Sequence, residues 1–177
     1  SNGGNSTVSG LGTLVMSQDS SASLYGGASA KSTLLNISPP GSGNTSGSST
    51  LQNKLSFTTA DVQTLTPGTT RLFFRIAVRL SSSSADVTQY PSVSLKGFFA
   101  DKSSGSTGVT YAYPTISTMS NVAVNQWTII QGYYSVPTGS VYTYLRGMYV
   151  DTLTPAGLTG AGSWAAINTD GAMIIKD

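Results

Sequence analysis

The chain has 177 residues and a formal net charge of +2, and charged residues make up only 9% of it. It contains no cysteine and no histidine, and every acidic residue is an aspartate. These absences exclude disulfide bonds, zinc–thiolate sites, Ser-His-Asp and Cys-His catalytic arrangements, and the usual imidazole base. So few charges predict no nucleic-acid-binding surface, and no apolar run approaches the roughly 20 residues of a membrane-spanning helix.

The first 50 residues are predicted to be an irregular N-terminal segment of the same domain. Two short runs in it suit strands, Leu11–Met16 and Thr33–Ile37. The stretch Ser38–Thr50 is rich in Ser, Gly, Pro and Asn, which is typical of a long mobile loop. A chain that opens at Ser1, without methionine or a signal peptide, is expected to be a processed product or a piece of a longer protein.

From residue 51 to the C-terminus, short apolar and aromatic runs alternate with turn signals such as those around Pro67 and Pro137. The strand candidates are Leu51–Thr58, Arg71–Leu80, Ser92–Ala100, Val109–Tyr113, Trp127–Val136, Val141–Val150 and Ala172–Lys176. No segment of ten or more residues has helical periodicity. Strands spaced in this way predict an all-β fold, a two-sheet antiparallel β-sandwich whose main part is residues 51–177.

The clearest strand candidate is Arg71–Leu80, in which alternate residues differ in character. Its even-numbered side chains are all apolar and are predicted to face the core. The opposite face carries Arg71, Phe73, Arg75 and Arg79. Two interpretations of that face stay open, because guanidinium groups bind carboxylates and stack on rings as readily as they face water. It is either a solvated outer surface or a contact surface for acidic sugars or a neighbouring subunit.

Ser92–Ala100 alternates in the same way. Val93, Leu95, Gly97 and Phe99 are predicted to point inward, and Phe98 to point outward with the polar residues. The polar stretch Asp101–Gly108 follows and is predicted to be the tip of a hairpin that leads into Val109–Tyr113.

The C-terminal third is rich in aromatic side chains, which suit a sugar-binding platform beside polar groups. Strict alternation in Val141–Val150 places Tyr142, Tyr144, Arg146 and Met148 on one face. That face is either a second core-facing side or a pair of tyrosines with an arginine clamp that bind a sugar.

Two further aromatic residues are candidate carbohydrate-binding residues. Tyr133 and its neighbour Tyr134 must point to opposite faces of their strand, so one of them is expected outside or in a groove. Trp164 lies among glycines and alanines and is predicted to sit on a loop. Together with Tyr142, Tyr144 and Arg146, these residues form the predicted binding site.

The aspartates offer little catalytic or metal chemistry. Asp86, Asp101, Asp151 and Asp170 could contribute to a calcium ion, but they lack the spacing of a calcium-binding loop, so no cofactor is predicted. A glycan-cleaving enzyme with two aspartates stays as an alternative, although no two of them share a sequence motif.

The stretch Asn125–Val150 resembles jelly-roll carbohydrate-binding modules. In both, a tryptophan (Trp127) opens a strand, a glycine and an aromatic residue follow, and a Val-Pro turn leads into alternating aromatics. The strand Arg71–Leu80 resembles an earlier strand of that family. The C-terminal run resembles its closing strand, although Gly171 follows Asp170 where many members have two consecutive acids.

The Ser/Thr/Gly-rich, cysteine-free composition also resembles distal domains of bacteriophage tail spikes and tail fibres. These resemblances imply a non-catalytic jelly-roll domain, homotrimeric and on the virion surface or otherwise extracellular, that binds a host surface polysaccharide. A structural trimerisation or capping domain is the alternative, with the arginine-bearing side of Arg71–Leu80 buried between subunits. No nucleic-acid or membrane partner is expected.

Overall fold

The computed structural model describes residues 13–35, 37, 50–105, 107–155, 158 and 160–177. Apart from one short 3-10 turn, η1 (Thr59–Asp61), the regular structure of these residues is β-strand. The strands are β1 (Thr13–Asp19), β2 (Ser29–Leu35), β3 (Thr50–Ser56), β4 (Gln63–Thr64), β5 (Arg71–Ser82), β6 (Gln89–Ala100), β7 (Tyr111–Ala112), β8 (Thr115–Ala123), β9 (Trp127–Ser135), β10 (Tyr144–Leu153) and β11 (Trp164–Lys176).

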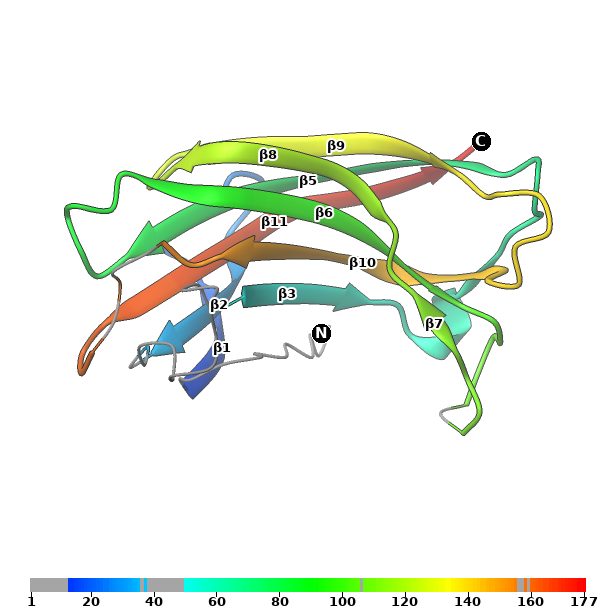
Figure 1. The fold of residues 1–177 in the computed structure, drawn as a ribbon, viewed down its shortest axis with the longest axis horizontal. Helices are drawn as coiled ribbons and strands as arrows, with labels where there is room; N and C mark the ends of the chain where they lie inside the picture. Colours follow the sequence, from blue (N-terminus) through cyan, green and yellow to red (C-terminus); the bar gives the residue numbers. More distant parts are fainter. Residues whose placement is uncertain (1–12, 36, 38–49, 106, 156–157, 159) are drawn as a thin grey trace, which may run out of the picture.

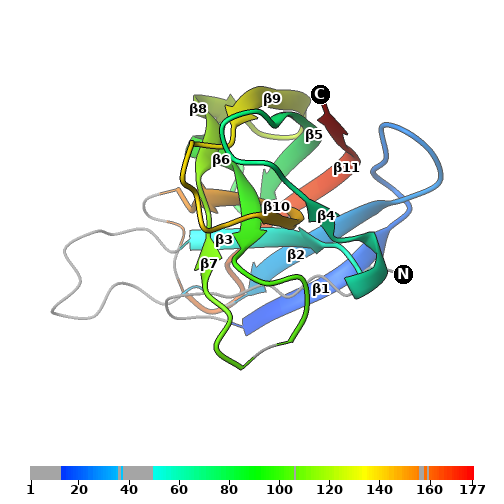
Figure 2. The same ribbon diagram turned by 90° about the vertical axis from the view of Figure 1, so that its right-hand side faces the viewer.

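The strands form two antiparallel sheets (Figure 1). One sheet has the strand order β1-β2-β11-β5-β9. The other has the order β3-β10-β6-β7, with β4 also paired to β10 and β8 also paired to β6. Seen from the end, the two sheets lie against each other as the layers of a sandwich (Figure 2).

The pairing of the long strands is nested. β2 pairs with β11, β3 with β10, β5 with β9, and β6 with β8, so the chain runs as one antiparallel ribbon folded over on itself. Successive pairs alternate between the two sheets. Eight strands wrapped in this way make a jelly roll. The predicted fold class, a two-sheet antiparallel β-sandwich of jelly-roll type, is therefore confirmed.

The core lies between β5 and β6 and their neighbours. The even-numbered residues of β5, from Leu72 to Leu80, are completely buried, as are Val93 and Leu95 of β6. The rings of Phe74 and Phe99 meet between the sheets with their centroids 6.4 Å apart. The inward-facing sets predicted for both strands are thus confirmed, and so is the hairpin, because β6 pairs with β7.

Several strands differ from the sequence prediction. β4 and β8 were not predicted, β7 spans only Tyr111–Ala112, β10 begins at Tyr144 and runs to Leu153, and β11 begins at Trp164 instead of Ala172. The first half of β11 is covered on both faces, because all residues from Ala165 to Thr169 are buried. A strand that is buried on both faces shows no alternation of apolar and polar residues. When its residues are also small, its sequence resembles that of a loop. The prediction that Trp164 lies on a loop is corrected: it is the first residue of a central strand.

The N-terminal strands are shifted relative to the sequence prediction but lie in the five-stranded sheet. β1 begins two residues later than the predicted run and extends to Asp19, and β2 ends at Leu35. Of the predicted mobile loop Ser38–Thr50, all but Thr50 lies outside the described residues. Thr50 itself begins β3.

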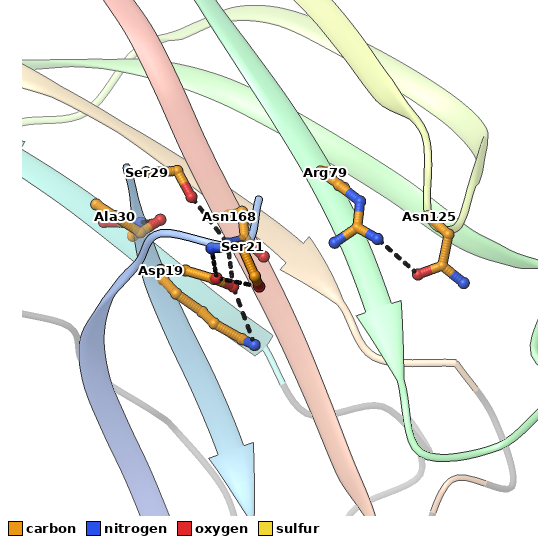
Figure 3. A network of polar contacts seen from close by, with 9 residues as sticks. Asp19, Ser21, Ser29, Ala30, Arg79, Asn125 and Asn168 are labelled. Atoms are coloured by element: carbon orange, nitrogen blue, oxygen red, sulfur yellow. Dashed lines mark hydrogen bonds and ion pairs between the residues drawn. The ribbon is translucent and has the colours of Figure 1, made fainter. Parts of the chain in front are cut away.

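A polar network joins β1, β2 and β11 (Figure 3). The Asp19 carboxylate accepts hydrogen bonds from the Ser21 hydroxyl (2.6 Å) and amide (3.0 Å) and from the Asn168 amide (3.1 Å). It also pairs with Lys31 at 3.3 Å, and Asn168 donates to the Ser29 hydroxyl at 2.9 Å. Hydrogen bonds hold the pKa of Asp19 well below its usual range. The bond from the Ser21 hydroxyl has the largest effect, and the bond from the Asn168 side chain has the next largest.

We expect Asp19→Asn to lower the free energy of unfolding by about 1–2 kcal/mol at neutral pH, the usual worth of hydrogen bonds to a charged group. Because the folded-state pKa lies below the value of 3.8 that an aspartate has in an unfolded chain, the stabilisation is present above pH 3.8 and is lost as the pH falls through the folded-state pKa. Urea unfolding of wild type and variant, measured at neutral pH and at successively lower pH, should therefore show a difference that shrinks with acid. Asp86→Asn, an exposed aspartate after β5, is the control. A difference independent of pH would contradict the role assigned to the charge.

Candidate functional site

The outer face of the six-stranded sheet carries four aromatic side chains in mutual contact. We call this the aromatic face, and it consists of Phe98, Tyr111, Tyr113 and Tyr149. The Phe98 and Tyr113 rings are stacked, with centroids 5.3 Å apart and planes inclined by 4°. Tyr111 lies 5.3 Å from Phe98, and Tyr149 meets Tyr113 edge-on at 5.4 Å. The four rings form one continuous cluster on strands β6, β7 and β10 and the residue that follows β7.

The four rings differ in exposure. Tyr111 is 37% exposed and Tyr113 is 42% exposed, whereas Phe98 is only 6% and Tyr149 only 8% exposed. Two tyrosine rings thus lie open to solvent, supported by two buried rings. Contacts with these buried rings restrict the side-chain freedom of the exposed pair, which lowers the entropic cost of ordering the two rings against another group.

Three cations surround the aromatic face. Lys54 places its Nζ atom 3.5 Å from the Phe98 centroid and 5.7 Å from that of Tyr113. The Arg146 guanidinium is 6.0 Å from the Tyr111 centroid and donates to the Lys102 carbonyl at 2.8 Å. Its Nε atom is buried and has no hydrogen-bond partner. Such cation–π contacts orient the lysine and arginine side chains along the rings.

Lys96 is held by a carboxylate. Its Nζ lies 2.6 Å from Asp151 and 5.5 Å from the centroid of Tyr149. Burial lowers the pKa of Lys96, but the hydrogen bond and charge of Asp151 outweigh that effect, so the pKa is raised. Lys96 is therefore charged at neutral pH.

A bulge in β10 creates this arrangement. The register between β6 and β10 shifts between Leu145 and Gly147, so Arg146 is an extra residue in the strand. After the bulge, Met148 faces the core and Tyr149 faces outward beside Lys96. Gly147 has φ 143°, and a side chain there would collide with the Leu55 carbonyl, so only glycine fits at this point.

The structure distributes the five sequence-predicted site residues over both sheets. Tyr142 packs against the core, and Tyr144 is half-buried at the start of β10. Arg146 contacts the Tyr111 ring of the aromatic face, and Tyr144 and Tyr111 pair with Ala100 from opposite sides. Tyr133 is exposed on β9 of the other sheet, and Trp164 begins β11 with Lys31 6.0 Å from its ring. The expectation that Tyr142, Tyr144, Arg146 and Met148 share a face is corrected, since it assumed alternation without a bulge.

The residues of the aromatic face were not among the sequence candidates. The outward position of Phe98 was predicted, and its neighbours were not, because Tyr111 and Tyr113 reach it only through the turn after β6. The sequence signal that could have found them is the Tyr-Ala-Tyr pattern at residues 111–113, in which two rings two residues apart share a face.

The outer face of the five-stranded sheet carries a second distinctive surface. We call it the arginine face, and it consists of Arg71, Phe73, Arg75 and Arg79. Arg75 donates to the Tyr25 hydroxyl at 2.8 Å, and Arg79 reaches the Asn125 side chain at 3.4 Å (Figure 3). The exposed apolar residues of this sheet include Ile129, Tyr133, Met173 and Ile175. The arginine face is therefore neither buried within this chain nor purely polar.

A hollow of about 450 Å³ opens at one end of the sandwich. Its lining includes Phe57, Asp61, Leu145, Ile174 and Lys176. The Asp61 carboxylate bonds the Thr58 hydroxyl, and Lys176 bonds the Thr64 carbonyl. Because these charged side chains already have partners within the chain, the hollow offers a ligand little unpaired chemistry.

The aspartates singled out from the sequence serve the chain itself. Asp101 accepts two hydrogen bonds from Thr110, Asp151 pairs with Lys96, and Asp170 accepts backbone N–H bonds from Leu24 and Tyr25. Asp86 is exposed. Within the described part of the chain, no group of three or more acidic side chains could hold a metal ion. Nor is any helix of that part long and apolar enough to cross a membrane.

No protein-family model and no curated protein sequence matches the chain. Solved structures match its fold. A structure described as carbohydrate-binding modules of the β-sandwich superfamily has a TM-score of 0.57 at 14% identity, over 98% of this chain and 57% of that one. A second match is the CBM22-1–GH10 modules of Clostridium thermocellum endo-1,4-β-D-xylanase 10B, complexed with xylohexaose. Its TM-score is 0.50 at 12% identity, over 96% of this chain and 25% of that one.

A third match is an endo-β-1,4-glucuronan lyase from the fungus Trichoderma reesei, with 13% identity over 98% of this chain and 91% of that one. Its TM-score is 0.48. The chain spans 57% of the first structure and 25% of the second. At 14% and 12% identity the likeness shows the fold alone: this chain has the β-sandwich fold in which carbohydrate-binding modules occur.

Proposed function

We propose that this chain is a non-catalytic carbohydrate-binding module whose ligand lies on the aromatic face. The observation that carries this proposal is the pair of exposed rings, Tyr111 and Tyr113, supported by the buried rings of Phe98 and Tyr149. Sugar rings present apolar C–H faces, which pack on aromatic platforms, and hydroxyl edges, which need donors and acceptors beside the platform.

The polar groups beside the rings supply those donors and acceptors. The Lys96–Asp151 pair lies in the same sheet as the platform and presents both a donor and an acceptor. One step further along β6, the hydroxyls of Ser94 and Thr118 are 3.0 Å apart on the exposed surface. Hydrogen-bonding groups next to a hydrophobic platform fit a polysaccharide chain better than they fit a wholly apolar ligand.

The fold likeness supports the same reading, because a β-sandwich of this kind occurs in structures described as carbohydrate-binding modules. A two-aspartate enzyme gains no support: Asp19, Asp61, Asp101, Asp151 and Asp170 all bond other groups of this chain. Glycoside hydrolysis uses two carboxyl groups that flank the scissile bond, and these five carboxylates bond to groups in different parts of the fold.

The cysteine-free, Ser/Thr-rich composition favours an extracellular or virion-surface setting. We therefore extend the proposal to a receptor-binding domain of a phage tail spike or tail fibre that recognises a polysaccharide on the host surface. Its support is the resemblance in composition to such domains.

The test is a binding screen of the purified chain by affinity electrophoresis against bacterial surface polysaccharides and plant cell-wall polysaccharides. We expect retardation by at least one polymer, without release of reducing sugar. Retardation by bacterial surface polymers supports the phage setting, and retardation by plant polymers alone speaks against it. Failure of every polymer to retard the chain would show that the proposed function is wrong.

A second function, subunit contact in a homotrimer, is favoured by the arginine face. Ile175 of β11 and Tyr133 of β9 flank Phe73 in one cross-strand row, and both are exposed. Apolar rows that are open to solvent are typical of surfaces that pack against another protein. We expect Ile175→Glu to convert a trimer to a monomer in size-exclusion chromatography with light scattering, while Ser120→Glu, at an exposed position of β8 in the other sheet, leaves the mass unchanged. A wild-type monomer at all concentrations disposes of this function.

A further inference from the structure

The aromatic face has an excess of positive charge. Its cations are Lys54, Lys96 and Arg146, and Asp151 is the carboxylate found among them. The Lys96–Asp151 pair at 2.6 Å is neutral as a unit. Lys54 and Arg146 remain, and no carboxylate of the described residues forms a salt bridge with either of them.

The two uncompensated cations border the same exposed rings. Lys54 lies over Phe98 and next to Tyr113, and Arg146 lies over Tyr111. Since Tyr111 and Tyr113 both contact Phe98, the two positive charges lie against one continuous cluster of rings. The strand register adds to this, because Lys54, Tyr149 and Lys96 form one cross-strand row.

The two cations repel each other. Burial lowers the pKa of Lys54, and the positive charge of Arg146 lowers it by a further, smaller amount. Two like charges on a half-buried aromatic surface reduce stability unless something compensates them. The chain leaves them there, and the Arg146 guanidinium, which donates to the Lys102 carbonyl through one Nη atom, carries further N–H groups.

An anionic group bound at the tyrosine pair would meet both charges at once. A guanidinium binds a carboxylate or sulfate through two N–H groups, and an ammonium adds a point charge. The sugar ring that carries the anion would stack on Tyr111 or Tyr113 at the same time. We propose that the ligand of the aromatic face is an acidic polysaccharide, whose anionic substituent lies between Lys54 and Arg146. This inference rests on the proposed carbohydrate-binding function and narrows it to one class of polymer.

The acid in the neighbouring hairpin is engaged within that hairpin. Asp101 lies in the hairpin beside Lys102, but both of its carboxylate oxygens bond Thr110, at 2.9 and 2.8 Å. The hydrogen bonds from Thr110 lower the pKa of Asp101, and the positive charge of Lys102 lowers it by a smaller amount. The carboxylate is therefore already stabilised within the hairpin.

The experiment compares four polymers by isothermal titration and affinity electrophoresis: polygalacturonate, its carboxyl-reduced form, dextran sulfate and dextran. We expect the chain to bind at least one of the anionic polymers, and to bind its uncharged counterpart at least about tenfold more weakly, as the loss of one charged hydrogen bond predicts. Preference for polygalacturonate identifies a carboxylate, and preference for dextran sulfate identifies a sulfate.

Charge-removing variants locate the anion. Lys54→Met keeps the aliphatic stem over Phe98 and is expected to weaken binding of the anionic polymer about tenfold, with a shallower salt dependence. Lys176→Met removes one positive charge from an exposed residue of β11 in the other sheet and is expected to have no effect. Equal losses in the two variants would reduce the effect to net charge and overturn the assignment.

The outcomes separate this inference from the function on which it rests. Tighter or equal binding of the uncharged polymers overturns the acidic ligand but leaves carbohydrate binding intact. Binding of none of the four polymers also overturns the acidic ligand, whereas the proposed function fails only if the wider polysaccharide screen finds no ligand either.

Discussion

Replacing Tyr113 by alanine is expected to weaken binding of the cognate polysaccharide at least about tenfold, the usual cost of removing a central aromatic contact. Tyr113 is the most exposed ring of the aromatic face, and it stacks on Phe98 with planes inclined by only 4°. Its removal therefore takes away the apolar surface that a sugar ring would cover, and it opens the Phe98 ring to water. Binding isotherms of wild type and variant with the polymer found in the screen measure the loss.

Two variants control for this result. Tyr133→Ala removes a ring that is 54% exposed on the opposite sheet and should leave the affinity unchanged. Tyr113→Phe keeps the ring and should retain most of the affinity, because stacking does not depend on the hydroxyl. If Tyr133→Ala weakens binding as much as Tyr113→Ala does, the ligand lies on the other sheet and the aromatic face is the wrong site.

The largest effect on stability is expected for Phe74→Ala, which should lower the free energy of unfolding by about 3–5 kcal/mol. Domains of this kind are stable by only about 5–15 kcal/mol, so the variant would lose a large part of its stability. The reason is position. Phe74 is completely buried, and its ring meets Phe99 of the opposite sheet at 6.4 Å, so alanine would leave a cavity between the two layers.

The adjacent residue is a matched control of the same chemistry. Phe73 lies on the outer face of β5, only partly buried, with its ring 5.0 Å from that of Tyr133. We expect Phe73→Ala to cost about 1 kcal/mol, the worth of an aromatic pair at the surface. Urea unfolding followed by tryptophan fluorescence and circular dichroism compares the two variants. Equal losses for Phe73 and Phe74 would contradict the alternation on which the two-layer arrangement depends.

The core of the sandwich was predictable because its strands are covered on one face only. In β5, apolar residues recur at every second position, and that periodicity places them together whatever the strand pairs with. The same holds for Val93, Leu95 and Phe99 in β6. The first half of β11 was missed for the opposite reason: both of its faces are covered, so alternation is absent.

The sequence candidates and the aromatic face are made of the same kinds of residue at different positions. Alternation in residues 141–150 assigned Tyr149 to the same face as Leu145, but the bulge at Arg146 shifts the pattern by one residue. A bulge depends on how two strands fit each other, because the extra residue is tolerated only where the partner strand leaves room for it. Gly147 is the local sign of this bulge, since a side chain there would collide with the Leu55 carbonyl of β3.

The amino-acid sequence by itself determined that this protein is an all-β sandwich without histidine or cysteine chemistry, and it marked which face of β5 and of β6 is buried. Those features follow from composition and from contacts a few residues apart, which any extended strand expresses. Only the tertiary structure decided which aromatic side chains form a surface. Tyr111 and Tyr113 lie in and just after β7, Tyr149 lies in β10, and they meet Phe98 of β6 and Lys54 of β3 through the register of four strands and one bulge. Register is a long-range property, because it depends on the fit between strands that are distant in sequence, and so it leaves no period in the sequence of any one of them.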